Sequence, residues 1–199
     1  MRRAHIAVVA AFALAGCEVY TPATPDAILA ARYESPEPPS VTLMSMVNGS
    51  SGRSEHAALL INGSQRVLYD PAGTFTHPDL PRAGDVHYGM TPRFVDYYER
   101  YHARFGYFVE VDEVPVSRAA ADRLIANAQA EGQQMKMMCG FAAADVLRPV
   151  PPFAEVTKSL WPEGLREDFK RMPGVTTSYV YENDIGQNKA WERSDQPRS

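Results

Sequence analysis

The chain has 199 residues, 45% of them apolar and 22% charged, with a formal net charge of −4 at pH 7. This length suits a single domain with a sizeable hydrophobic core. Because the chain is net acidic, nucleic acid is excluded as an expected partner, and no basic excess draws the chain to anionic lipid headgroups.

The chain begins with the pattern of a bacterial lipoprotein signal. Two arginines precede an apolar run at residues 6–15, which is too short to span a membrane. Leu14-Ala15-Gly16-Cys17 then matches a lipobox, in which cleavage precedes a cysteine that receives the lipid. We therefore expect residues 1–16 to be a signal peptide and Cys17 to be the lipidated residue.

The expected location follows from this anchor. A single acyl chain anchors a protein only marginally, whereas the multiply acylated cysteine of a bacterial lipoprotein holds it stably. Aspartate after the lipidated cysteine retains some lipoproteins at the inner membrane, and this chain has Glu18 there. We expect a protein of the bacterial cell envelope that is attached to the outer membrane through Cys17 and faces the periplasm.

The rest of the chain divides into a tether, a domain and a tail. Residues 17–40 begin with the lipidated cysteine and are rich in proline, which predicts a tether without a packed element. Residues 41–181 carry the apolar runs and turn signals expected of one domain. Residues 182–199 are polar and are predicted to be a loose tail.

Strands are predicted first, at residues 41–47, 56–61 and 66–69. Asn62-Gly63 lies between the last two of these strands and is a strong hairpin signal. A long loop that contains several prolines follows the hairpin.

Helices dominate the second half of the chain. Thr91-Pro92 is an N-cap followed by proline at the first helical position, which predicts the start of a helix. The predicted elements are then a helix at 92–105, a strand at 107–116, a helix at 118–131, a short buried helix at 140–147, a helix that ends at Phe169 and a strand at 176–181. This order predicts an α+β fold, in which helices pack against an antiparallel sheet.

Cys139 is the cysteine left for chemistry once Cys17 carries a lipid, because the chain has 2 cysteines in all. No intramolecular disulfide is then expected, which leaves either an inert buried thiol or a nucleophile. A nucleophilic thiol works as its thiolate, and a nearby imidazole or a helix N-terminus lowers its pKa. Cys139 lies where the short buried helix should begin, so it is the candidate nucleophile.

His56 and Asp70 are the candidate partners of that thiol, His56 as the base and Asp70 as the residue that orients the imidazole. A two-residue loop at Asn62-Gly63 would place His56 opposite Tyr69. A three-residue loop would place it opposite Asp70, on the same face of the sheet. The sequence leaves both registers open, and Tyr69 is therefore the reserve candidate for orienting His56.

The order of these features resembles a known family. His56 opens an apolar strand, a hairpin ends in Asp70, a strand runs into a helix capped by Ser117, and Cys139 opens a helix of small residues. This order resembles the circularly permuted papain-like hydrolases, the NlpC-like group that includes relatives of lecithin:retinol acyltransferase, over roughly residues 41–148. The resemblance implies a permuted papain-like core with Cys139 as nucleophile, His56 as base and Asp70 as orienting residue.

Two classes of function fit these observations. The first is a cysteine hydrolase or acyltransferase that attacks an amide or ester bond, and the resemblance implies a peptidoglycan peptide or an acyl substrate. The second is a non-catalytic envelope lipoprotein that binds a partner or ligand on the same scaffold, or serves as a structural subunit. Neither a cofactor nor a metal is expected, because His77, His87 and His102 lack metal-ligand spacing and are predicted to lie on the surface.

Overall fold

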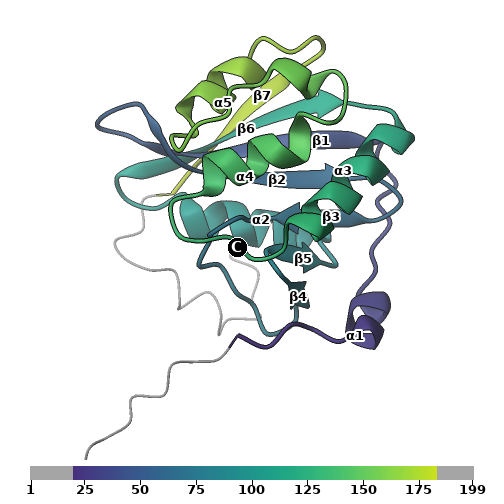
Figure 1. Ribbon diagram of the computed structural model, residues 1–199. Coiled ribbons are helices and arrows are strands. Elements are labelled where there is room, and N and C mark those ends of the chain that lie inside the picture. Colours follow the sequence, from purple (N-terminus) through teal and green to yellow (C-terminus); the bar gives the residue numbers. More distant parts are fainter. Residues whose placement is uncertain (1–19, 183–199) are drawn as a thin grey trace, which may run out of the picture.

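The computed structural model describes residues 20–182 as an α+β fold. A 7-stranded antiparallel sheet has the strand order β4-β5-β3-β2-β1-β6-β7, and helices cover both of its faces (Figure 1). The predicted signal peptide at residues 1–16, Cys17, Glu18 and residues 183–199 of the predicted tail lie outside the described residues. Within the described range, no helix has both the length and the apolar character needed to cross a membrane.

Long paired strands form the middle of the sheet. β1 (Ser40–Asn48) pairs with β2 (Ser54–Asn62) on one side and with β6 (Tyr107–Pro115) on the other. β3 (Arg66–Tyr69) extends the sheet beyond β2, and β7 (Thr176–Tyr181) extends it beyond β6. β1 and most of β2 are buried, as is typical of strands that are covered on both faces.

The hairpin between β2 and β3 has neither of the registers predicted from sequence. Leu59 pairs with Tyr69 and Asn62 pairs with Arg66, which leaves residues 63–65 as the loop. The loop therefore begins one residue later than the three-residue loop predicted from sequence.

A helix on the sheet accounts for this shift. The Ser64 N–H donates to the Asp122 carboxylate at 2.6 Å, and the Arg118 guanidinium donates to the Gly63 carbonyl at 2.7 Å. Both partners belong to α3 (Arg118–Glu131). The loop therefore takes the register that suits a helix far along the chain, which no local turn pattern contains.

The observed register keeps Asp70 on the same face of the sheet as His56. If this pairing is extended by one residue beyond Leu59 and Tyr69, Asp70 lies opposite Ala58. Ala58 is two residues along the strand from His56. Because side chains alternate between faces, residues two apart on a strand are neighbours on one face. Asp70 is thus a diagonal neighbour of His56.

The long loop predicted after β3 contains two short strands. β4 (Arg82–Ala83) pairs with β5 (Val86–Tyr88), and β5 pairs with β3 at this edge of the sheet. Gly84 turns the chain between them with a φ of 60°, a conformation that favours glycine. Strands of this length are too short to show an alternating pattern, so the sequence indicated only a loop.

The expectation that residues 17–40 form no packed element is wrong for the part that the structure describes. α1 (Pro25–Ala30) is a short helix, capped by Thr24 and opened by proline at its first position. The Tyr20 hydroxyl donates to the Gly84 carbonyl at 3.1 Å. This segment therefore packs along the β4 edge of the domain.

The longer helices divide between the two faces of the sheet (Figure 1). α2 (Pro92–His102) packs on one face, whereas α3, α4 (Cys139–Leu147) and α5 (Glu163–Phe169) pack on the other. The 3₁₀-helix η1 (Phe153–Glu155) lies in the link between α4 and α5. α2 ends three residues before the predicted end, and Phe105 is consequently exposed.

Small side chains bring α4 close to the sheet. Ala142, Ala143 and Ala144 are buried in the same core cluster as Ala57 of β2. Alanine lets a helix backbone approach a strand more closely than larger residues allow. This packing brings Cys139, the first residue of α4, to the beginning of β2.

Candidate active site

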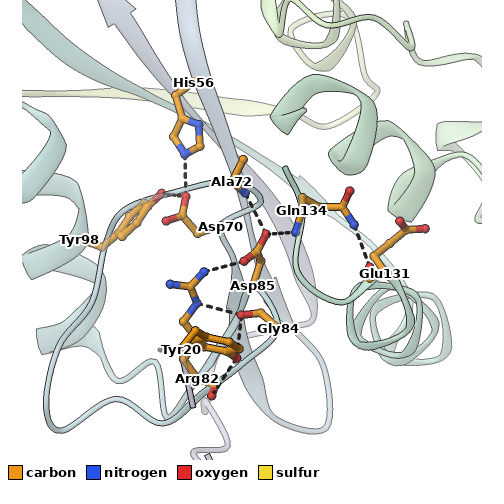
Figure 2. Close-up of polar contacts among 10 residues, drawn as sticks. All are labelled: Tyr20, His56, Asp70, Ala72, Arg82, Gly84, Asp85, Tyr98, Glu131 and Gln134. Atoms are coloured by element: carbon orange, nitrogen blue, oxygen red, sulfur yellow. Dashed lines mark hydrogen bonds and ion pairs between the residues drawn. The ribbon is translucent and has the colours of Figure 1, made fainter. Parts of the chain in front are cut away.

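The structure brings His56, Asp70 and Cys139 together at one end of β2. His56 is near the start of β2, Asp70 directly follows β3, and Cys139 opens α4. His56 Nε2 lies 2.6 Å from Asp70 Oδ1 (Figure 2), and the Cys139 thiol lies close enough to the His56 side chain for that side chain to lower its pKa. Because Nε2 faces Asp70, Nδ1 is the ring nitrogen left for the thiol.

The thiol reaches the ring where the sheet has a gap. β3 pairs with β2 only from Leu59 to Asn62, so the earlier residues of β2 have no partner from β3. The backbone of Ala57 hydrogen-bonds to the Cys139 thiol there. The contact between thiol and imidazole is therefore built on regular structure rather than on a mobile loop.

Asp70 is fully enclosed by its neighbours. It is 1% exposed, and its Oδ1 accepts hydrogen bonds from His56 Nε2 and, at 2.9 Å, from the Tyr98 hydroxyl (Figure 2). A side chain at Gly73 would overlap the Asp70 carboxylate, so only glycine fits at that turn. Burial raises the pKa of Asp70, but the attraction of His56 outweighs burial and holds the pKa below its usual range.

The His56 imidazole is positively charged at neutral pH. Burial alone would lower its pKa, because burial penalises the charged ring. The negative charge of Asp70 and the hydrogen bond to it, together with Cys139, outweigh burial and raise the pKa of His56 from 6.5 to about 10. The side chain is 20% exposed, which leaves the charged ring accessible to a substrate.

The Cys139 thiol is activated in the same contact. The residue is 4% exposed, and burial by itself raises the pKa of its thiol. The hydrogen bond and positive charge of His56, with backbone hydrogen bonds from Ala57 and Gly140, outweigh burial and lower this pKa. The contact with His56 therefore favours the thiolate form of Cys139 beside an imidazolium.

Gly140 fixes the surroundings of the thiol. A side chain at this position would overlap the Ser159 carbonyl oxygen, so only glycine lets that segment reach the start of α4. Leu160 and Trp161 follow Ser159 and lie beside Cys139 as a result. The Gly140 backbone thus helps to lower the pKa of the thiol. The absence of a side chain at Gly140 also lets Leu160 and Trp161 lie beside Cys139.

A buried carboxylate, Asp85, holds the two loops on which the site depends. Its Oδ2 accepts hydrogen bonds from the backbone N–H groups of Ala72 and Gln134, both at 2.9 Å, and Arg82 donates to its Oδ1 at 2.6 Å (Figure 2). Ala72 lies in the turn that follows β3, and Gln134 lies in the segment that leads into α4. Asp85 therefore sets the position of the turn that begins at Asp70 relative to that of the segment that leads to Cys139.

The prediction that the other histidines lie on the surface is wrong for two of them. His87 and His102 are 1% and 8% exposed, whereas His77 is partly buried. The His102 ring stacks at 6.0 Å from that of His56, and its Nδ1 donates to the Tyr98 carbonyl at 3.0 Å. Burial lowers the pKa of His87 and of His102 to about 4, so both rings are neutral near the charged His56.

Tyr69, the reserve candidate for orienting His56, does not lie in the site. It is fully buried in the core cluster beneath α3 and α4, together with Leu59 and Val67. Ala58 belongs to the other cluster, beneath α2, and shares its face with His56. The observed register therefore selects Asp70 as the partner of the imidazole.

Sequence reasoning missed three residues that support the site. Tyr98 lies within the predicted helix at 92–105, but nothing in helical spacing indicates a hydrogen bond to an acid. Asp85 follows a glycine in a segment that looks like a loop. Gly73 had a signal, because Asp70-Pro71-Ala72-Gly73 is a tight turn, although the turn alone does not indicate what the glycine accommodates.

Two cavities reach the residues of the site. A cleft of about 260 Å³ has His56 in its wall, and a smaller one of about 80 Å³ has Cys139 in its wall. Glu55 lines both. A substrate could thus extend in both directions from the thiol.

Within residues 20–182, no group of three or more His, Cys, Asp or Glu side chains is placed to hold a metal ion. Comparison of the chain with protein-family models, with curated proteins and with solved structures finds no match.

Proposed function

We propose that this protein is an envelope lipoprotein, anchored by a lipid on Cys17, that acts as a cysteine hydrolase or acyltransferase on an amide or ester bond. One observation carries the proposal. His56 is hydrogen-bonded to Asp70, its imidazole is charged, and it lowers the pKa of the neighbouring Cys139 thiol. A thiolate beside an imidazolium is the state in which cysteine attacks a carbonyl group.

The reaction follows from this pair. Cys139 Sγ forms a bond to the carbonyl carbon, and an electron pair moves onto the carbonyl oxygen. His56 gives its proton to the leaving nitrogen or oxygen as the bond to the carbonyl carbon breaks, which leaves the acyl group on Sγ as a thioester. Water, or an acceptor hydroxyl in a transferase, then gives a proton to His56 and attacks the thioester. Release of the thiolate restores the ion pair.

The start of α4 supplies stabilisation for the charge that develops on the carbonyl oxygen. The first N–H groups of a helix have no partner within the helix, and the helix dipole makes this end positive. Because Cys139 is the first residue of α4, these N–H groups lie beside the attacking sulfur. Such donors are among the largest contributions to acyl-transfer catalysis.

Asp70 and Tyr98 keep the imidazole in its working state. Asp70 accepts from Nε2 and so directs Nδ1 toward the thiol. The Tyr98 hydroxyl donates to the same Oδ1 and restrains the carboxylate. Neither residue reacts itself, and both act through the orientation and charge of His56.

The arrangement supports the permuted papain-like, NlpC-like core as the architecture behind this chemistry. His56 precedes Cys139 in the chain, and it lies on a strand against which the Cys139 helix packs. A peptidoglycan peptide or an acyl substrate is the substrate class in this proposal. The lipid on Cys17 would hold the site near either one.

Alkylation of Cys139 by iodoacetamide tests the proposal. Full-length protein is labelled at pH 6, native and in urea, and peptide mapping separates Cys139 from Cys17. We expect the native thiol to react at least about tenfold faster than the unfolded one, because His56 lowers the pKa of the native thiol and so raises its ionised fraction at this pH. His56→Ala should remove this advantage, whereas the matched control His77→Ala should retain it.

An equal rate for native and unfolded protein, unchanged by His56→Ala, would contradict the enzyme proposal. The chain would then be a non-catalytic lipoprotein that uses the same scaffold to bind a partner or ligand. Labelling that is fast but unaffected by His56→Ala would also contradict it, because the thiol would then owe its reactivity to another group.

A further inference from the structure

The two cavities beside the thiol differ in chemistry. Cys139 lines the smaller cavity with four apolar residues, Met137, Leu160, Trp161 and Pro162, and with Glu55, which also lines the larger cavity. His56 lines the larger cavity with polar and charged side chains, which include Thr74, His102, Arg104 and Tyr107. A substrate that spans the site therefore meets an apolar surface on one side and a polar surface on the other.

The proposed reaction decides which part of the substrate lies on which side. After attack the acyl group stays bonded to Cys139 Sγ, so it occupies the cavity that Cys139 lines. The leaving group must receive the proton of His56, so it occupies the cavity that His56 lines. This assignment rests on the proposed function, but it uses the position of each catalytic atom and not the resemblance to any family.

The acyl cavity suits a short aliphatic group. Its volume is about 80 Å³. A cavity of roughly 150 Å³ holds benzene, so this one holds a group about half that size. Met137 and Trp161 remain 70% and 63% exposed, which is a large apolar area to leave in water without an occupant.

The walls of the acyl cavity are held in place by the backbone. Met137 has a φ of 70°, an uncommon conformation for a residue with a side chain. Ser159 lies against Gly140, which sets the position of Leu160 and Trp161. The backbone therefore sets the positions from which these side chains extend beside the thiol.

The leaving-group cavity contains an arginine that is available for an anion. Arg104 is half-buried and forms no ion pair with any residue that the structure describes. The carboxylate in this wall is that of Glu55, which accepts hydrogen bonds from the Tyr107 hydroxyl at 2.6 Å and from the Asn48 amide at 3.0 Å. Glu55 is thus occupied by neutral donors and leaves the Arg104 guanidinium free to bind a substrate.

We propose that the substrate joins a short apolar acyl group to a leaving group that carries an anionic oxygen group. The acyl group binds between Met137, Leu160 and Trp161, and the anion binds Arg104. The guanidinium recognises carboxylate and phosphate alike, so either group satisfies the proposal. Arg104 and Trp161 are specificity residues in this arrangement and take no part in the chemical step.

A set of butyryl esters tests the anion site. The leaving groups are 3-methylphenol, 3-hydroxybenzoate and 3-hydroxyphenyl phosphate, which share one ring and differ in charge. We expect kcat/KM to be about tenfold higher for the better of the two anionic esters than for the neutral one, a difference typical of one charge-assisted contact. Arg104→Met should abolish this preference, and the exposed Arg53→Met is the matched control that should retain it.

A second series tests the acyl cavity. Acetyl, butyryl, octanoyl and succinyl esters of the preferred leaving group are compared. We expect butyryl to exceed succinyl at least tenfold, because succinyl places a carboxylate against apolar side chains. Trp161→Ala should reduce the preference for butyryl, whereas Leu29→Ala, which removes an equally exposed apolar side chain from α1, should not.

The outcomes separate this inference from the proposed function. If Cys139 is no more reactive toward iodoacetamide than the unfolded thiol, the proposed function fails and the inference fails with it. If Cys139 is reactive but forms no butyryl adduct by mass spectrometry, the inference alone is overturned. The same holds if rates do not depend on the charge of the leaving group, or if succinyl esters react as fast as butyryl esters.

Discussion

Two buried carboxylates on the sheet have opposite characters. Glu110 of β6 is 0% exposed and accepts from Arg166 through Nε and Nη2, both at 2.8 Å, and from Lys170 at 2.9 Å. Asp70 is equally buried, but its charged partner is His56, and its Oδ2 has no hydrogen-bond partner among the described residues. One carboxylate is saturated by permanent cations, whereas the other depends on a group that titrates.

The difference separates an ion pair with fixed charges from one whose cation can lose a proton. Burial raises the pKa of Glu110, but the hydrogen bonds of Arg166 and Lys170 outweigh it and lower the pKa, so the charges stay fixed over the working pH range. The proton on His56 can leave, and it lies next to a thiol and two cavities. A perturbed pKa therefore indicates function only when the partner can exchange a proton and a substrate can reach it.

The largest effect is expected from removal of His56, the proposed proton donor and the charged partner of Asp70. We expect His56→Ala to lower kcat/KM for a butyryl ester about 10³-fold, which is within the range for a general acid–base group. Steady-state kinetics check this, with His77→Ala as a control that keeps activity. A loss smaller than about tenfold would mean that another group carries the proton.

Breaking the Glu110 pair should affect stability and not reactivity. Arg166→Met leaves a buried carboxylate with Lys170 as its remaining cation, and we expect a loss of about 3 kcal/mol in the free energy of unfolding. Urea denaturation checks this. The exposed Arg171→Met breaks an ion pair with Asp168 on the same segment and should cost less than about 1 kcal/mol. Slower alkylation of Cys139 in folded Arg166→Met would show that the two regions are not independent.

Neutralising Asp70 should change the pH dependence of the thiol. Without the negative charge, the pKa of His56 falls and that of Cys139 rises, so Asp70→Asn should slow alkylation at pH 6 about tenfold, the effect of one pKa unit. At pH 9 the rates should converge, because an ordinary thiol is then also ionised. A constant ratio from pH 6 to pH 9 would argue against this electrostatic account.

The same pair gives a stability prediction with a definite sign. The pKa of His56 is about 10 in the folded state and 6.5 ordinarily, so its contribution is fully present below pH 6.5 and is lost as the pH rises through 10. We expect the wild type to lose more unfolding free energy between pH 6 and pH 10 than His56→Ala does. Urea denaturation at the two pH values measures this difference, and equal losses would contradict the assignment.

The smallest effect is expected from a positioning residue. Tyr98→Phe removes the hydrogen bond to Asp70 Oδ1, worth about 1 kcal/mol, and should lower kcat roughly fivefold with little change in KM. Tyr69→Phe is the matched control, because its buried hydroxyl has no hydrogen-bond partner among the described residues. If both variants lose the same activity, the effect of Tyr98 is general packing and not positioning.

The sequence predicted the parts of the fold that depend on local pattern. The α+β class and the long strands follow from apolar runs, and the start of α2 follows from Thr91-Pro92. The hairpin register could not be predicted, because Asp122 and Arg118 of a distant helix hold the loop. The two-residue strand β4 is too short to have a pattern at all.

In the candidate site too, some residues could be predicted from the sequence, whereas the contacts between them could not. Cys139 could be named because it is the cysteine left once Cys17 carries the expected lipid, and His56 because it opens a strand that precedes Cys139 in the chain. Their contact, the Tyr98 hydrogen bond and the anchoring by Asp85 all join segments far apart in the chain. Such pairings arise from topology, and no spacing along the sequence indicates them.

The buried carboxylate of Asp85 has a consequence for the order in which activity appears during folding. It links the turn after β3 to the segment that enters α4, so thiol and imidazole meet only when both loops have closed on it. Before that point Cys139 has neither the charge of His56 nor the Ala57 backbone beside it. The lowered pKa of the Cys139 thiol is therefore expected only after both of these segments have packed against Asp85.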